Sequence, residues 1–196
     1  NHRGGLLSVC FLLALYFSTN GMSSLIQALN ASYHIRESKS IIKHQILSII
    51  LTLILSALLF VTILLIIFGK TTINYLIEYQ VISSNEVFIL NSAKWIILII
   101  MLFLGITTIF NLGPAIKSKL KVFSAGAILA TIFIILTSIL FSYYINNFSQ
   151  YNKIYGSIGT LMIILIWMYF NAIILLTGFE LNASILNAKE QIKNKK

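Results

Sequence analysis

The sequence is poor in charge and contains no aspartate. Charged residues make up 10% of its 196 residues, whereas a soluble domain carries about a quarter, because water must solvate its surface. All five acidic residues are glutamates, against fourteen Lys and Arg. Hydrophobic residues reach 58%, and the mean hydropathy is +0.93. This balance excludes an ordinary soluble domain and indicates a membrane protein.

Cysteine and clustered histidine are also scarce. The single Cys10 excludes an internal disulfide and a cysteine-rich zinc site, and we interpret it as a small buried hydrophobic residue. Metal-dependent hydrolysis of RNA needs His and carboxylate ligands together to hold and activate water. His2, His34 and His44 have no ligand spacing with nearby acids, and we interpret them as contacts to lipid headgroups. We therefore expect no metal, no cofactor and no enzymatic activity.

Long apolar blocks, in contrast, are abundant. A bilayer core about 30 Å thick needs about 20 helical residues to cross it. Five blocks meet this length, at residues 6–29, 45–68, 87–111, 124–145 and 157–181. A transmembrane barrel would show alternating strands of about ten residues instead. We predict an all-α, polytopic transmembrane bundle that forms a single domain over residues 1–196.

The basic residues fall mainly on one side of the predicted membrane. Ten of them lie after the first block, after the third block or after the last one, and four lie on the other side. The positive-inside rule therefore places these two loops and the C-terminus in the cytoplasm. We expect them to contact anionic headgroups of the lipid bilayer and not nucleic acid, whose binding needs one concentrated basic face. On the opposite side, residues 72–82 form a candidate interfacial helix.

Polar side chains inside a span are costly in lipid, so they normally face protein or a cavity. In the first block, Asn20, Ser24 and Gln27 recur at i, i+4 and i+7 and share one helical face. Ser23 and Asn30 overlap this face. Two interpretations stay open for this set. The residues either form hydrogen bonds between helices, where small neighbours allow close approach, or line a polar pathway.

The last block carries a second polar set. Asn171 lies near the middle of the membrane, and Glu180 and Asn182 lie near the predicted cytoplasmic end, as Gln27 and Asn30 do in the first block. Because the depths match, we expect the first and last spans to pack together through their polar ends. A carboxylate at Glu180 either binds a proton or cation or reaches the membrane interface, where its charge costs less.

Several motifs resemble the YihY/BrkB family of bacterial inner-membrane proteins. The pattern S-x-N-G-M-x-x-L-I-x-A-L-N-x-x-Y spans residues 18–33, and Y-x-x-x-Y-G-x-x-G spans residues 151–159. They are followed by W-x-Y at residues 167–169 and by G-x-E-L-N-A at residues 178–183. The Gly-Pro pair at residues 113–114 and Gly126, at the start of the fourth block, also match the family layout. The resemblance covers essentially the whole chain.

The resemblance implies about six spans, each of the length that a bilayer requires. Since the chain begins at Asn1 without an initiator Met, we expect one further span upstream in the full-length protein. Phe179 departs from the family pattern, which usually has a small residue there. The family is also labelled ribonuclease BN or virulence factor, a label that the absence of aspartate argues against. The expected function is a transporter or channel-like protein for a solute; the alternative is a non-transporting scaffold or envelope-integrity protein.

Overall fold

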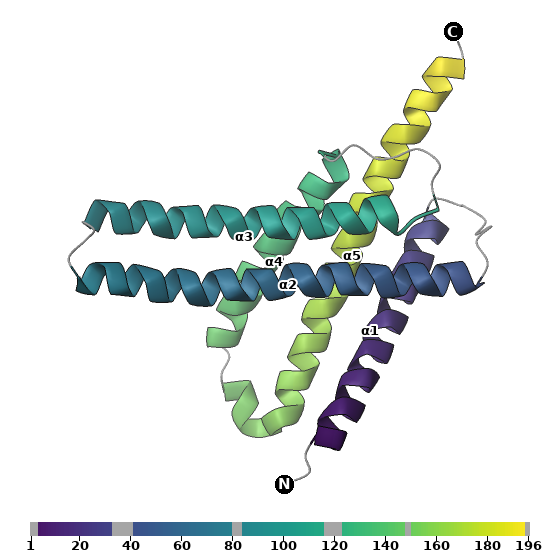
Figure 1. The fold of residues 1–196 in the computed structure, drawn as a ribbon. Helices are drawn as coiled ribbons and strands as arrows, with labels where there is room; N and C mark the ends of the chain where they lie inside the picture. The colour runs from purple at the N-terminus through teal and green to yellow at the C-terminus, as the bar shows by residue number, and fades with distance from the viewer. Residues whose placement is uncertain (1–3, 33–40, 80–83, 116–122, 148–149, 195–196) are drawn as a thin grey trace. The chain divides into compact units, whose positions relative to one another are not determined.

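The computed structural model describes residues 4–32, 41–79, 84–115, 123–147 and 150–194. Within these residues the chain forms five helices and no strand (Figure 1). The helices are α1 (Gly4–Ser32), α2 (Ile41–Glu78), α3 (Ser84–Leu112), α4 (Ala125–Asn147) and α5 (Gln150–Asn194). All five are long and apolar enough to cross a membrane. The prediction of an all-helical transmembrane protein with five spans in this sequence is confirmed.

The helices extend further than the apolar blocks. The candidate interfacial helix at residues 72–82 is not separate, because α2 continues without a break to Glu78; residues 80–82 lie outside the described part. Likewise α5 begins at Gln150 and ends at Asn194, so Lys153 and Lys189 lie in a helix and not in a loop or tail. An apolar block marks only the segment inside hydrocarbon. Helical hydrogen bonding continues past it through residues of good helix propensity such as Lys, Glu and Gln.

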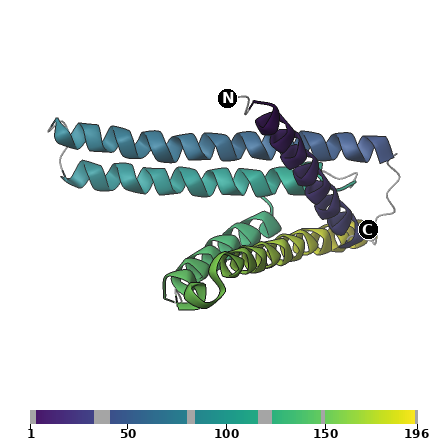
Figure 2. The ribbon, with the colours of Figure 1, turned by 90° about the horizontal axis from the view of Figure 1, so that it is seen from below.

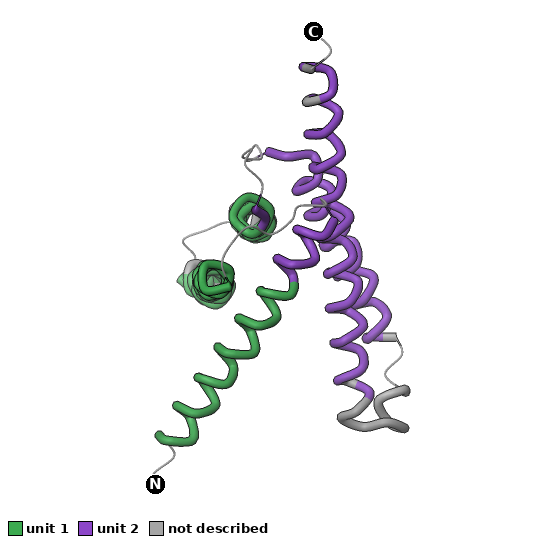
Figure 3. Tube along the Cα trace, turned by 90° about the vertical axis from the view of Figure 1, so that its right-hand side faces the viewer, with its two compact units in different colours: residues 1–24, 39–113 green, residues 25–38, 114–196 purple. Residues whose placement is uncertain are grey.

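The chain divides into two compact units, which Figure 3 colours separately. The first comprises residues 1–24 and 39–113, and the second comprises residues 25–38 and 114–196. In the first unit α2 and α3 run side by side in opposite directions, and in the second α4 and α5 do the same (Figures 1 and 2). Helix α1 contributes its first part to one unit and its last eight residues, 25–32, to the other.

Many large hydrophobic side chains point outward, while several small and polar side chains are buried. Phe11 and Leu59 are 67% and 61% exposed, whereas Ser48 and Asn182 are 0% and 3% exposed. Hydrocarbon solvates apolar groups as well as a protein core does, so helices associate through close packing and hydrogen bonds instead. Cys10 also lies on the outward-facing surface. It is exposed, so the prediction that it is buried is wrong. A thiol behaves as a small hydrophobic group and can face lipid at little cost.

Candidate functional site

The polar contacts between α4 and α5 centre on Asn182, whose side chain is 3% exposed. Its Oδ1 accepts a hydrogen bond from the Gly126 N–H at 2.7 Å, and its Nδ2 donates one to Ser124 Oγ at 3.0 Å. Ser124 immediately precedes α4, and its hydroxyl also accepts a bond from the Ala127 N–H at 3.3 Å. The first N–H groups of a helix lack partners within the helix. Here Ser124 satisfies one of them as an N-cap, and Asn182 satisfies another from α5.

This contact requires glycine at position 126. A Cβ atom there would collide with the carbonyl oxygen of Gly178 and would lie 2.7 Å from Cγ of Asn182. The backbones of α4 and α5 therefore approach each other directly, as small residues permit between transmembrane helices. The bulky Phe179 next to Gly178 is completely buried, so the packing accommodates the departure from the family pattern.

Asn30, near the end of α1, holds the chain that follows α3. Its Oδ1 accepts a hydrogen bond from the Ala115 N–H at 2.9 Å, and it is 3% exposed. Helix α3 ends just before, where the Gly113 N–H donates to the Ile109 carbonyl at 2.9 Å, and Pro114 cannot continue the helix. Asn30 thus fixes the start of the loop between α3 and α4.

A third buried contact lies in the first unit, between α1 and α2. Ser23 Oγ and His44 Nε2 are 2.8 Å apart, and the two residues are 9% and 7% exposed. The interpretation of His44 as a headgroup contact is therefore wrong. Helix α2 begins at Ile41, before the predicted block, and this places His44 inside the helix, where Ser23 supplies the partner that a buried polar group needs.

The buried face of α1 is one residue out of register with the face marked by Asn20, Ser24 and Gln27. Asn20 is half-buried, and Ser24 and Gln27 are exposed. The buried polar positions come one residue earlier, at Thr19 and Ser23, which are 3% and 9% exposed. The Ser24 hydroxyl donates to the Asn20 carbonyl within the same helix at 3.1 Å. An exposed polar face therefore runs along α1 beside the buried one.

In α5 the polar residues have unequal surroundings. Asn171 is half-buried, and its Nδ2 donates to the Trp167 carbonyl of the same helix at 2.7 Å. Its Oδ1 is buried and has no hydrogen-bond partner among the described residues. Glu180 is exposed. The same helix thus carries one amide that is bonded through both its oxygen and its nitrogen, one amide with an unused acceptor and one exposed carboxylate.

The partners of the two buried asparagines are not those expected. Helix α5 makes its extensive contact with α4, and the bonds of Asn182 go to the start of that helix rather than to α1. The bond of Asn30 goes to Ala115. Sequence analysis singled out Gly126 only as part of the family resemblance and did not identify Ser124, although a serine just before an apolar run is a recognisable N-cap signal.

Two cavities in the described residues have apolar walls. One, of about 540 Å³, lies between α4 and α5 and includes Phe141, Ile163 and Phe170 in its lining. The other, of about 440 Å³, lies between α2 and α3. The linings of both contain none of the polar residues predicted for the site. In the described part of the chain, no three His, Cys, Asp or Glu side chains come together as a metal site would need.

Comparison with known proteins gives a consistent result. The family model described as Virulence factor BrkB matches residues 1–196. The ribonuclease-like protein YfkH of Bacillus subtilis (strain 168) is 31% identical over 190 residues, which are 97% of this chain and 69% of that protein. A UPF0761 membrane protein of Haemophilus influenzae (strain PittEE) is 37% identical over 87 residues, 44% of this chain and 32% of its own length.

A UPF0761 membrane protein of Idiomarina loihiensis is 30% identical over 106 residues, 54% of this chain and 36% of its own length. The matches thus span only about a third of the UPF0761 relatives. No solved structure matches the chain. With the family model covering every residue and five helices able to span a membrane, the chain is an integral membrane protein of the Virulence factor BrkB family.

Proposed function

We propose that the protein is a transporter or channel-like protein whose solute path runs along the exposed polar face of α1. One observation carries this proposal: Ser24 and Gln27 are exposed and Asn20 is half-buried within a membrane-spanning helix. Polar side chains turned toward lipid are costly and are normally turned toward protein or a water-filled cavity. A polar face of this kind supports a path for a hydrophilic solute.

Glu180 is the acidic group that we assign to the same activity. It is the only acid within the apolar span at residues 157–181 and is exposed there. An ionisable residue in or beside a span is a candidate for binding a proton or a cation. In this role Glu180 acts through its charge, while the neighbouring Asn182 holds the helices together.

Water access to the α1 face tests the proposal. In a full-length protein with Cys10 changed to Ser, single cysteines are introduced as Ser24→Cys, Gln27→Cys or Phe17→Cys. Phe17 is the control, since it is 65% exposed on an apolar part of the same helix. A charged thiol reagent reacts with the thiolate, which forms only where water reaches. Labelling of Ser24→Cys and Gln27→Cys, with Phe17→Cys protected, is expected. Protection of all three would overturn the proposal.

A second candidate is a non-transporting scaffold or envelope-integrity protein. The bonds of Asn182 to Gly126 and Ser124, and the Ser23–His44 contact, favour it, because they fasten helices in buried surroundings. In this case the α1 face packs against protein, and the cysteines at positions 24 and 27 are protected in the membrane but react after unfolding in detergent.

The proposed setting is the inner membrane, with the C-terminus and the basic loops at residues 33–40 and 115–123 in the cytoplasm. The distribution of Lys and Arg supports this orientation. In intact cells an impermeant thiol reagent should label Ser149→Cys and leave Ser118→Cys unlabelled until the membrane is permeabilised. The reverse pattern would invert the orientation.

We also propose that the protein is not a ribonuclease, although the relative YfkH is described as ribonuclease-like. The sequence has no aspartate and only three histidines, and hydrolysis by a bound metal needs clustered ligands. Purified full-length protein should not hydrolyse RNA in the presence of Mg²⁺ or Zn²⁺. Hydrolysis that is retained through purification and abolished by a substitution in this chain would contradict this.

A further inference from the structure

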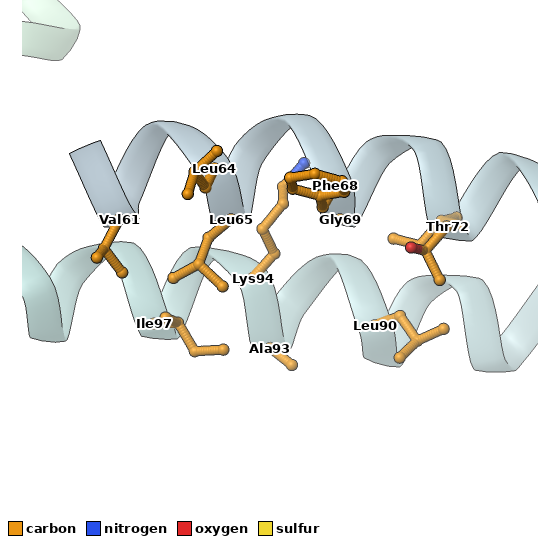
Figure 4. A pocket seen from close by; sticks show the side chains of 11 residues that line it. Val61, Leu64, Leu65, Phe68, Gly69, Thr72, Leu90, Ala93, Lys94 and Ile97 are labelled. Atoms are coloured by element: carbon orange, nitrogen blue, oxygen red, sulfur yellow. The ribbon is translucent and has the colours of Figure 1, made fainter. Parts of the chain in front are cut away.

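The cavity between α2 and α3 is an apolar groove near the end of the pair where the two helices connect (Figure 4). Its volume is about 440 Å³. Side chains from both helices form its walls, among them Leu65 and Phe68 of α2 and Leu90 and Ile97 of α3. The groove lies entirely within the first unit.

Among the lining residues that the structure describes, Lys94 is the only charged one. Figure 4 shows its side chain crossing from α3 toward α2. The stem packs against α2, since a Cβ atom at Gly69 would lie 3.7 Å from Cδ of Lys94. The groove thus combines apolar walls with one ammonium group.

The depth of Lys94 in the membrane can be counted from both helices. The apolar block of α2 ends at Phe68, next to Gly69, where the lysine crosses. The α3 span, Val87–Leu112, is 26 residues long, about 39 Å at 1.5 Å per residue. A hydrocarbon core of about 30 Å centred on this span places Lys94 about four residues inside its edge. A lysine at this level extends its ammonium toward the headgroups while its stem stays in apolar surroundings.

We propose that this groove binds an anionic phospholipid, with one acyl chain between α2 and α3 and the headgroup phosphate against the Lys94 ammonium. The apolar walls match an acyl chain, and the volume lies within the range of small-molecule sites. The single cation complements a headgroup of net negative charge. A zwitterionic lipid carries its own cation and gains less from Lys94. This inference is independent of the proposed transport activity.

Native mass spectrometry of the full-length protein tests this inference, with dioleoylphosphatidylglycerol and dioleoylphosphatidylcholine added separately. The wild-type protein should retain more of the anionic lipid. Lys94→Gln should lower retention of phosphatidylglycerol several-fold and change that of phosphatidylcholine little, and Lys94→Arg should preserve the preference. Lys43→Gln is the matched control, because it removes one charge from the opposite end of α2, outside the groove.

A second variant tests the apolar part of the groove. Ala93→Trp adds bulk at an exposed position of the lining and keeps the charge of Lys94, so it should lower retention of both lipids. Equal losses for Lys94→Gln and Lys43→Gln would overturn the proposal in favour of a general charge effect. It is also overturned if Ala93→Trp retains both lipids normally or if the wild-type protein has no lipid preference.

Discussion

Where α4 and α5 meet, backbone lies against backbone, whereas α2 and α3 meet through side chains. A Cβ atom at Gly126 of α4 would collide with the Gly178 carbonyl of α5, and Asn182 closes the same contact with two hydrogen bonds. A Cβ atom at Gly105 of α3 would lie 3.6 Å from Cδ2 of Leu55 in α2, an ordinary van der Waals distance. One helix pair thus depends on a glycine and the other does not.

The difference follows from what holds helices together in lipid. No hydrophobic force favours helix contact there, so a pair relies on close packing, on hydrogen bonds or on both. Helices α4 and α5 concentrate both at one point, around Asn182. Helices α2 and α3 spread their contact over apolar side chains and leave a groove at Lys94. We expect α4–α5 to be sensitive to single substitutions and α2–α3 to tolerate them. The predictions below run from the largest expected change in unfolding free energy to the smallest.

Gly126→Ala should be the most damaging of these changes. Its methyl group cannot fit against the Gly178 carbonyl, so the helices must separate and the hydrogen bond from the Gly126 N–H to Asn182 Oδ1 must lengthen. Overpacking of this kind typically costs about 1–3 kcal/mol. Thermal unfolding in detergent, followed by circular dichroism, measures the loss.

Gly105→Ala is the control for this prediction. Its added methyl group meets Leu55 at an ordinary distance, and alanine in place of glycine favours a helix by about 0.5–1 kcal/mol. The melting temperature should stay the same or rise. Equal destabilisation by Gly126→Ala and Gly105→Ala would abolish the contrast between the two helix pairs.

Asn182→Ala should come next, because it removes both hydrogen bonds that join α5 to the start of α4. Hydrogen bonds between transmembrane helices average about 0.6 kcal/mol each, so the expected loss is about 1 kcal/mol. Ser184→Ala, at an exposed position of the same helix, should change little. A double-mutant cycle with Ser124→Ala isolates the bond between the two side chains. Additive effects in that cycle would show that Asn182 and Ser124 do not interact.

The existence of the helices could be predicted from the sequence more accurately than the residues at which they begin and end. All five apolar blocks are helical because their length and hydropathy leave few alternatives in a bilayer. The end of α2 near Glu78 and the start of α5 at Gln150 were missed. Beyond the hydrocarbon no hydropathy signal remains, and helix propensity alone sets the boundary there.

The site could be predicted only in part. Burial of Asn30 and Asn182 agrees with the expectation that polar groups in spans face protein or a cavity. Periodicity gives a face but not its partner, so the contact of Asn182 with α4 could not be deduced. Adjacent serines also left the α1 register ambiguous, and the structure buries Ser23 and exposes Ser24. His44 was misjudged because its partner comes from another helix.

The variants Ser23→Ala and Ser24→Ala test which of the two serines lies on the buried face of α1. Ser23→Ala leaves the buried His44 Nε2 without its hydroxyl partner, and the expected loss is about 0.6 kcal/mol. Ser24→Ala removes only a bond from an exposed hydroxyl to a carbonyl of its own helix, and its effect should be close to zero. Thermal unfolding of the two variants side by side checks the prediction. If Ser24→Ala is the more damaging change, the assignment of Ser23 to the buried face and of Ser24 to the exposed face is wrong.

Glu180→Gln should have the smallest effect on stability, although it lies two residues from Asn182. The carboxylate is exposed, and substitutions at exposed positions usually stay within about 0.5 kcal/mol of zero. Glutamine keeps the size and hydrogen-bonding capacity of the side chain and removes only its charge. If Glu180 binds a proton or cation during transport, the variant should unfold like the wild-type protein. It should nevertheless fail to restore the wild-type phenotype to a deletion strain. Asn182→Ala should instead act mainly on stability and lower the free energy of unfolding, because Asn182 joins two packed helices. Full complementation by Glu180→Gln would remove the carboxylate from the mechanism and favour the scaffold, in which polar residues of α5 serve packing alone.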